Sequence, residues 1–273
     1  MRTIAHLSDL HFGTEIPAVA DALVRELQVR PPSLVVVSGD LTQRARARQF
    51  AAARDYLARL PQPQLVVPGN HDVPLFDVVR RFLAPLARYR RFISANLDPT
   101  FVDDELHVTA LNTARSFTWK SGRISMTQLD LLRRRLGEAG SRRKIVVTHH
   151  PFIPPPNDAG IALVGRAALA IPVLNAGQVD LLLAGHLHRG YAGDIRPYYP
   201  AASHAVIAAQ AGTATSGRTR HEPNAYNWIT LDRDRITIAV RAWNGRSFGA
   251  IRESIYEHTA AGWTPVADGA PQR

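Results

Sequence analysis

The chain has 273 residues, of which 45% are hydrophobic and 21% are charged, the composition of a globular protein with a sizeable core. No hydrophobic run approaches the ~18–20 residues that a membrane-spanning helix needs, and cysteine is absent. These features exclude membrane-spanning helices, a disulfide framework and a metal site built on thiolates.

The formal net charge of +10 has two interpretations. A basic surface is typical of proteins that bind nucleotides, nucleic acids or acidic lipids. However, only Lys120 and Lys144 are lysines, so 31 of the 33 basic residues (33 less 2) are arginine, which equally fits a biased composition. The basic stretches at 44–48 and 133–135 contain no interleaved aromatic residues. We therefore favour a solvated basic surface over nucleic-acid binding.

The N-terminal sequence MRTIAHLSDLHFG predicts the first strand of the fold. It contains an arginine but no apolar segment followed by a small-residue cleavage site, so it does not have the pattern of a signal peptide. We therefore expect a cytoplasmic location, which agrees with the absence of cysteine.

The first two thirds of the chain alternate strand-length apolar runs with helical patterns. The runs that predict strands buried on both faces are 4–7, 34–37, 65–67, 145–147 and 181–183. The helical patterns are Val19, Leu23 and Leu27 after Pro17; Phe50, Ala53, Leu57 and Leu60; and Leu129, Leu132 and Leu136 after a capping box at Ser125. This alternation predicts an α/β fold with a largely parallel sheet.

The last third has a different pattern. Residues 228–231 and 236–242 read as a hairpin with one buried face, and 248–256 reads as a further strand. We expect these strands to form a second, more antiparallel sheet that packs on the first. We expect one domain over residues 1–258 and a loose C-terminal tail over 259–273, which is rich in Ala, Gly and Pro.

Polar residues of a particular kind follow each of the five predicted buried strands. They are Asp9 and His11; Gly39 and Asp40; Gly69, Asn70, His71 and Asp72; His149, His150 and Pro151; and Gly185, His186 and His188. The carboxyl ends of parallel strands open onto one crevice in an α/β sheet, so these side chains should converge. A single Gly-Asp or a lone His at a strand end is usually structural, but five such groups in succession are not required by packing.

The chemistry of this set points to metal ions. Carboxylate, imidazole and amide oxygen without thiolate form a suitable set of ligands for Mn²⁺, Fe or Zn²⁺. The candidates exceed what one ion needs, and two ions that share a bridging carboxylate would use them all.

The same blocks, in this order over residues 1–190, resemble the calcineurin-like metallophosphoesterase superfamily. The short intervals and the compact C-terminal strands are most similar to its bacterial class III branch, the cyclic-nucleotide phosphodiesterase-like proteins. The resemblance implies a four-layered α/β/β/α sandwich with two mixed sheets, and an active site with two divalent or mixed-valence metal ions (Mn, Fe or Zn).

Residue by residue, the resemblance implies two metal sites that share Asp40. The first would use Asp9, His11, Asp40 and His188, and the second Asp40, Asn70, His149 and His186. His149 is preferred over its neighbour His150 because the family block is His-x-Pro, which Pro151 fixes.

The resemblance also assigns roles outside the metal ligands. His71 is the imidazole of these blocks that the family does not use as a ligand, and it would stabilise the transition state or protonate the leaving group. Asp72 would orient the turn. His150 would lie behind the ligands or face the substrate, and we take it, with Asn112, as a candidate substrate contact.

The implied activity is hydrolysis of phosphodiester bonds by attack of a metal-bridging hydroxide, with cyclic nucleotides such as cyclic AMP as candidate substrates. The partner would be a small anionic diester. The alternatives are a pyrophosphohydrolase, a lipid-headgroup phosphodiesterase or a nuclease on the same metal site, and a non-catalytic scaffold. The scaffold is least favoured because no candidate ligand is missing.

Three predicted long loops, at 113–123, 151–161 and 213–224, are candidate walls for a substrate. They carry the basic residues Arg115, Lys120, Arg218, Arg220 and His221, which could contact a phosphate or a ribose. For any single one of these residues, exposed charge on a surface loop is the preferred interpretation.

Overall fold

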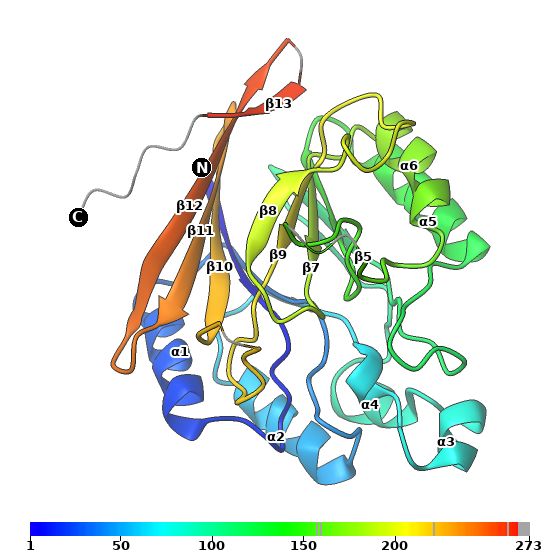
Figure 1. Cartoon of the computed structure of the whole chain (residues 1–273), viewed down its shortest axis with the longest axis vertical. Helices are drawn as coiled ribbons and strands as arrows, with labels where there is room; N and C mark the ends of the chain where they lie inside the picture. The colour runs from blue at the N-terminus through cyan, green and yellow to red at the C-terminus, as the bar shows by residue number, and fades with distance from the viewer. Residues whose placement is uncertain (157, 159, 221, 261, 267–273) are drawn as a thin grey trace.

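The computed structural model describes residues 1–156, 158, 160–220, 222–260 and 262–266. Two β-sheets lie face to face at the centre of the molecule, and helices cover the outer face of each sheet (Figure 1). The expected four-layered α/β/β/α arrangement with two mixed sheets is therefore confirmed. Within the described residues, no helix is both long and apolar enough to cross a membrane.

The first sheet has seven strands within the described residues, in the order β13-β12-β11-β10-β1-β2-β3. Their bounds are β1 (Arg2–Leu7), β2 (Leu34–Val37), β3 (Gln64–Val66), β10 (Ala225–Leu231), β11 (Arg235–Trp243), β12 (Phe248–Thr259) and β13 (Gly262–Pro265). Strands β1 to β3 are parallel because a helix separates each from the next, and the other pairings are antiparallel.

The second sheet has six strands within the described residues, in the order β4-β5-β6-β7-β9-β8. Their bounds are β4 (Thr100–Val102), β5 (Leu106–Ala110), β6 (Arg143–Val147), β7 (Leu181–Ala184), β8 (Tyr191–Asp194) and β9 (Ile207–Gln210). Strands β5, β6, β7 and β9 are parallel, and antiparallel strands close both edges.

The helices follow the apolar periodicity of the sequence. The bounds are α1 (Pro17–Val29), α2 (Ala47–Leu57), α3 (Val78–Leu83), α4 (Ala87–Phe92), α5 (Met126–Glu138) and α6 (Ala167–Ala176), with a 3₁₀ turn at Asn70–Asp72. The three helical patterns expected from the sequence correspond to α1, α2 and α5. The expected cap of α5 is confirmed, since Ser125 Oγ accepts a hydrogen bond from the backbone N–H of Gln128 at 3.1 Å.

Three hydrophobic layers hold the sandwich together. One lies between the first sheet and helices α1 and α2, and includes Leu7 and Leu23. The second lies between the two sheets, where Val36 and Val147 are among the fully buried residues. The third packs α5 and α6 on the second sheet. The buried strands thus have apolar side chains on both faces, which explains their continuous apolar runs.

The C-terminal strands do not form a sheet of their own, contrary to expectation. Strand β10 pairs antiparallel with β1, so β10 to β13 extend the sheet that contains β1 to β3. The second sheet is built around β5, β6, β7 and β9 instead. Alternation of apolar residues predicts that a segment is a strand, but it does not identify the edge on which that strand pairs.

The described part of the expected tail contains a strand. Strand β13 pairs with the end of β12, and the Trp263 side chain is buried there. Its indole Nε1–H donates a hydrogen bond to Asp180 Oδ1 at 3.1 Å, which ties the segment to the start of β7. Residues 267–273 of the expected tail lie outside the described residues.

Candidate metal centre

The polar residues that follow β1, β2, β3, β6 and β7 converge at one edge of the sandwich, as the sequence predicts. Two contacts join loops that belong to different sheets. His149 Nδ1, after β6, lies 2.7 Å from the backbone oxygen of Ser38, after β2. The backbone N–H of His186, after β7, donates to Asp9 Oδ2 at 2.9 Å. The site therefore spans the seam between the two sheets.

Three of the candidate ligands form a first group of inward-facing atoms. His188 Nε2 lies 3.2 Å from Asp9 Oδ1 and 3.3 Å from His11 Nε2. His11 Nε2 is 3.5 Å from Asp9 Oδ1 and 3.7 Å from Asp40 Oδ2. All four side chains are buried.

The remaining candidates form a second group beside the first. Asn70 Oδ1 lies 3.1 Å from His149 Nε2 and 3.0 Å from His186 Nδ1. His149 Nε2 is also 3.4 Å from Asp40 Oδ1. The two carboxylate oxygens of Asp40 thus face different groups, an arrangement that allows one carboxylate to bridge two ions.

The backbone at these positions is held in an unusual conformation. Five candidate ligands have positive φ angles: Asp9 at 55°, His11 at 48°, Asp40 at 53°, His186 at 75° and His188 at 59°. A residue other than glycine in this region costs on the order of 1–3 kcal/mol and occurs mainly at functional sites. The fold therefore holds strain where the inward-facing atoms gather.

The donor atoms fit metal ions. Asp9 Oδ1, one of the inward-facing atoms, is buried and has no hydrogen-bond partner among the described residues. His188 Nδ1 donates to the backbone oxygen of Arg218 at 2.6 Å, and His149 Nδ1 to that of Ser38, which orients both Nε2 atoms toward the cluster. Oxygen and imidazole nitrogen in this number suit two divalent ions.

The electrostatics of the cluster favour a bound cation. Burial opposes ionisation of Asp40, but His149 and His71 hold its pKa well below the usual range. In turn, against the effect of burial, Asp40 raises the pKa of His149 to about 9. Burial lowers the pKa of His186 to about 3, helped by His149. Ionised carboxylates next to the neutral imidazole of His186 make a site that attracts divalent cations, and binding of a cation would displace the proton of His149.

Asp72 has the orienting position that was expected of it. Its carboxylate accepts hydrogen bonds from the backbone N–H groups of Gly69, Leu41 and Thr42, and from the Thr42 hydroxyl, at 2.9–3.1 Å. These bonds join the loop after β3 to the loop after β2. Burial and the neighbouring Asp40 raise the pKa of Asp72 to about 6.

His71 lies against the cluster. Its backbone N–H donates to Asp40 Oδ1 at 2.7 Å, and its ring stands edge-on to that of His11 at 4.8 Å. One of its ring nitrogens comes within 4.8 Å of ligand atoms of His11 and Asp40. However, Nδ1 lies 2.9 Å from the backbone oxygen of Gln43 and Nε2 lies 3.0 Å from Arg218 Nη1, so both nitrogens have partners.

The two candidate substrate contacts, His150 and Asn112, are both buried. His150 is buried behind His149 and His186, with Nδ1 2.7 Å from the Thr113 hydroxyl and Nε2 3.1 Å from the backbone oxygen of Lys120. Asn112 is buried at the end of β5, where its Oδ1 accepts from the backbone N–H of Ala114. Both assignments as substrate contacts stay predictions, and in this structure protein groups occupy the polar atoms of these side chains.

The loop residues behave differently from one another. Arg115 donates to the backbone oxygens of Asn112 and Ala114 and to Gln128, so it supports its own loop. Arg218 reaches the cluster, whereas Arg220 and Lys120 are exposed. His221 lies outside the described residues.

The sequence did not predict the roles of Ser38 and Gln43. Both residues contact the cluster through backbone oxygens, which no side-chain pattern reveals.

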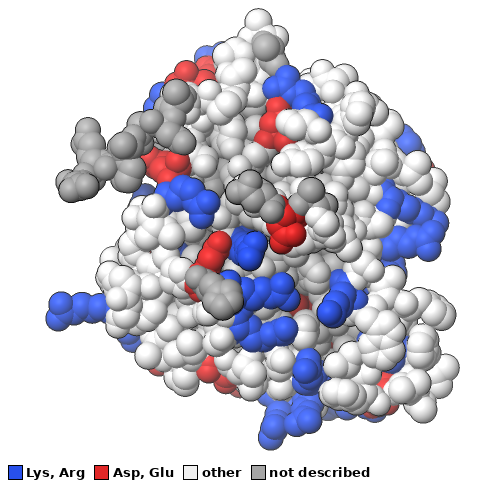
Figure 2. Space-filling model, in the orientation of Figure 1, with Lys and Arg blue, Asp and Glu red and all other residues white. Residues whose placement is uncertain are grey.

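The basic side chains are not evenly spread. On the face seen in Figure 2, several lysine or arginine side chains gather near the middle, beside a few acidic ones. Part of the net positive charge is thus concentrated on one region of the surface.

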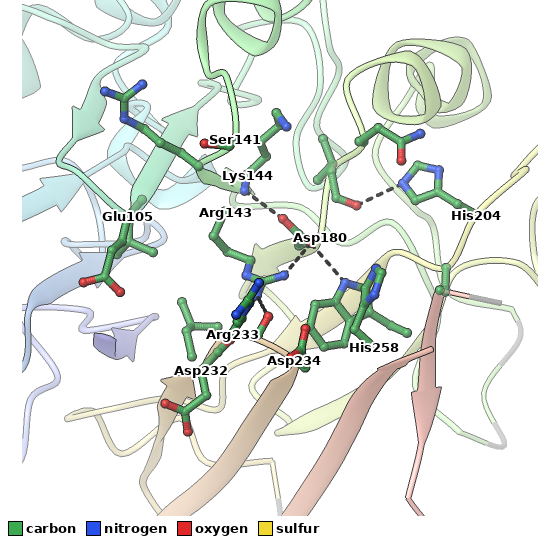
Figure 3. A pocket seen from close by; sticks show the side chains of 18 of the residues that line it. Glu105, Ser141, Arg143, Lys144, Asp180, His204, Asp232, Arg233, Asp234 and His258 are labelled. Atoms are coloured by element: carbon green, nitrogen blue, oxygen red, sulfur yellow. Dashed lines mark hydrogen bonds and ion pairs between the residues drawn. The ribbon is translucent and has the colours of Figure 1, made fainter. Parts of the chain in front are cut away.

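A cavity of about 920 Å³ (Figure 3) lies at the opposite edge of the sandwich. Residues at the amino-terminal ends of β1, β5, β6 and β7 line it, and it contains none of the candidate ligands. Its buried charge is balanced internally: Asp180 accepts hydrogen bonds from Arg143, at 2.9 Å, and from the backbone N–H of Lys144, at 2.8 Å. The candidate metal ligands therefore lie at the other edge of the sandwich.

A two-sheet sandwich with this cluster at its strand ends has the architecture of a metal-dependent hydrolase. The family model described as calcineurin-like phosphoesterase matches residues 2–190, more than two thirds of the chain. The protein belongs to this family and is a phosphoesterase by class.

Three relatives of this chain have names that state an activity. A probable cyclic nucleotide phosphodiesterase of Synechococcus sp. is 27% identical over 199 residues, 69% of this chain and 74% of the relative. The glycerophosphodiester phosphodiesterase GpdQ of Enterobacter lignolyticus is 27% identical over 55% of this chain and 57% of its own length. The 3',5'-cyclic adenosine monophosphate phosphodiesterase CpdA of Escherichia coli is 27% identical over 58% and 51%.

Solved structures share the fold at low sequence identity. PhoD superposes with a TM-score of 0.74 and 12% identity, over 98% of this chain and 72% of its own. A dimetal phosphatase from Danio rerio superposes with a TM-score of 0.65 and 15% identity, over 94% of this chain and 99% of its own. These likenesses concern the fold.

Proposed function

We propose that the protein is a dinuclear metal-dependent phosphodiesterase that hydrolyses small diesters, with cyclic nucleotides such as cyclic AMP as the first candidates. The observation that carries this proposal is the position of Asp40, whose two oxygens face two separate groups of ligand atoms. Two relatives named as cyclic nucleotide phosphodiesterases support the substrate class.

Asp9, His11, Asp40 and His188 would hold one ion, and Asp40, Asn70, His149 and His186 the other. A pair of divalent ions, as Mn, Fe or Zn, supplies a nucleophile at neutral pH and neutralises charge on the phosphoryl group. The chain itself fixes the ligands: the Ser38 and Arg218 carbonyls orient two imidazoles, and the Asp72 carboxylate joins two ligand loops. Asn70 provides a neutral oxygen, so it does not cancel metal charge.

His71 would act on the substrate rather than on the metals. Its two ring nitrogens already have partners in Gln43 and Arg218, and its backbone N–H fixes Asp40. Its position next to the bridging carboxylate suits a group that stabilises the transition state or transfers a proton to the leaving group.

A lipid-headgroup diester is the second candidate substrate. Large apolar side chains lie exposed on the α3 region and the 113–123 loop, with Phe76 at 77%, Phe117 at 86% and Trp119 at 57% exposure. The rings of Phe82 and Phe117 are in contact, with centroids 5.3 Å apart. Such a patch suits an amphiphilic substrate, and one relative is named for glycerophosphodiesters.

The test is hydrolysis by the Mn²⁺-loaded protein of 3',5'-cyclic AMP, 2',3'-cyclic AMP, glycerophosphocholine, bis-p-nitrophenyl phosphate and p-nitrophenyl phosphate. We expect turnover of the artificial diester and of a cyclic nucleotide, with little of the monoester. Turnover of glycerophosphocholine without the cyclic nucleotides would select the second candidate. Turnover of the monoester alone would overturn the phosphodiesterase proposal.

A further inference from the structure

Arg218 connects a metal ligand with His71. It lies in the 213–224 loop, between β9 and β10. Its backbone oxygen accepts a hydrogen bond from Nδ1 of His188 at 2.6 Å. Its side chain reaches the other way, and Nη1 lies 3.0 Å from His71 Nε2 and 3.2 Å from Gln43 Oε1. One residue thus touches the cluster from two sides.

The hydrogen bond to His71 has a defined direction. A guanidinium only donates, so His71 Nε2 must accept, and its Nδ1–H then donates to the backbone oxygen of Gln43 at 2.9 Å. In this arrangement the His71 ring presents no N–H to the cluster, so it could protonate a leaving group only once the Arg218 guanidinium has turned from Nε2 to the substrate. The hydrogen-bond donors at this side of the site are Arg218 and Arg44, whose Nη1 lies 3.4 Å from His71 Nδ1.

The charge of Arg218 is not paired. Its guanidinium makes hydrogen bonds only to neutral groups, and neither Nε nor Nη2 has a partner within the described part of the chain. The acidic groups that attract its charge are Asp40 and Asp9. Both carboxylates are candidate ligands, so bound divalent ions would use their negative charge. The positive charge of the half-buried guanidinium would then have no negative partner, which favours binding of an anion beside it.

We propose that Arg218 is a phosphate-binding residue, whose guanidinium donates to non-bridging oxygens of the substrate's phosphodiester group beside His71. The inference rests on the proposed function, because it deepens the same site. It assigns the 213–224 loop to the phosphate rather than to the base or alcohol of the substrate. It also selects one arginine from the several basic residues on the surface.

The experiment compares Arg218→Ala, Arg218→Lys and Arg220→Ala with the natural protein. Isothermal titration with inorganic phosphate measures anion affinity of the Mn²⁺-loaded proteins without any turnover, and elemental analysis measures bound metal. We expect Arg218→Ala to bind phosphate about 10–100-fold more weakly, the effect of losing a charge-assisted hydrogen bond. Arg218→Lys should keep part of the affinity, since it keeps the charge but not the planar fork.

Two controls separate binding from other roles. The carbonyl that orients His188 belongs to the backbone, so Arg218→Ala should keep its metal content. Arg220→Ala removes the same charge from the same loop, at an exposed residue, and should change phosphate affinity by less than about twofold.

Three results would overturn the inference: unchanged phosphate affinity in Arg218→Ala, loss of metal in that variant, or an equal loss of affinity in Arg220→Ala. Failure of the proposed function looks different. In that case the natural protein hydrolyses no diester, while its phosphate affinity still depends on Arg218.

Discussion

His71 shows how a side chain can lie next to the candidate metal ligands while its own ring nitrogens are occupied by other partners. Its ring nitrogens have partners in Gln43 and Arg218, and its contact with Asp40 runs through the backbone N–H, which any residue would keep. We therefore predict that His71→Ala retains its metal but lowers kcat for a diester by ~10²–10⁴-fold, the usual contribution of acid–base catalysis. Elemental analysis and steady-state kinetics measure the two effects.

The matched control for that variant is His258→Ala, an exposed histidine at the opposite edge of the sandwich (Figure 3), which should keep full activity. Loss of metal from His71→Ala would mean that His71 is a ligand and would refute its assignment.

His6 predicts a dependence of stability on pH. It is fully buried in β1, with Nε2 2.9 Å from the Ser38 hydroxyl, and burial lowers its pKa to about 3. The folded protein thus keeps His6 neutral, whereas the unfolded chain takes up a proton below the ordinary pKa of about 6.5. Stability from this group is present above pH 6.5 and is lost as pH falls from there toward the folded pKa.

Between pH 7.5 and pH 5 the loss from His6 amounts to about 2 kcal/mol. Urea denaturation of the metal-free protein at both pH values measures it. His6→Asn will be less stable overall, but it lacks the titrating group. Between these two pH values its free energy of unfolding should therefore fall less than that of the natural protein, and the difference should be about 2 kcal/mol. If the free energy of unfolding fell by the same amount in both proteins between the two pH values, His6 would not be a neutral buried histidine.

At the scale of elements, strand β13 depends on one residue. Trp263 is buried, donates to Asp180, and lies under the Arg143 guanidinium at 4.7 Å. We predict that Trp263→Ala lowers the free energy of unfolding by about 3–5 kcal/mol, as large-to-small core substitutions do. Ile251→Ala, at an exposed position of the neighbouring strand β12, should cost less than about 0.5 kcal/mol.

Metal content separates this effect from damage to the site. Trp263 belongs to the edge of the sandwich opposite the candidate ligands, so Trp263→Ala should bind the same amount of metal as the natural protein. A variant with unchanged stability would show that β13 does not hold the two sheets together at this edge.

The elements also show what a sequence can and cannot predict. Helices α1, α2 and α5 follow directly from apolar spacing, and β10 to β12 from alternation. The pairing of β10 with β1 could not be predicted, because it depends on which sheet edge is free in three dimensions. At the site, side-chain ligands such as Asp40 could be predicted from their place after strands. The roles of Ser38 and Gln43 could not, because backbone carbonyls leave no pattern, and Arg218 could be predicted only as one of several basic loop residues, because the loop conformation decides which of them reaches the site.

At the scale of the whole molecule, the candidate centre joins the two sheets, so metal should act on global stability. Five ligands are held at positive φ, and ionised Asp9 and Asp40 lie in one buried cluster, which without cations is a source of strain and repulsion. Ions that bind only the folded state stabilise it by about 4 kcal/mol when their free concentration is a thousandfold above Kd.

For a chain of this size, about 1 kcal/mol shifts Tm by roughly 2–4 °C, so removing tightly bound metal with EDTA should lower Tm by roughly 10 °C. Adding Mn²⁺ back should restore it. Asp40→Ala is the decisive comparison, because loss of the shared carboxylate should remove both ions and leave Tm insensitive to EDTA. If that variant still bound two equivalents of metal, Asp40 would not bridge the two groups, and the centre would consist of two independent sites.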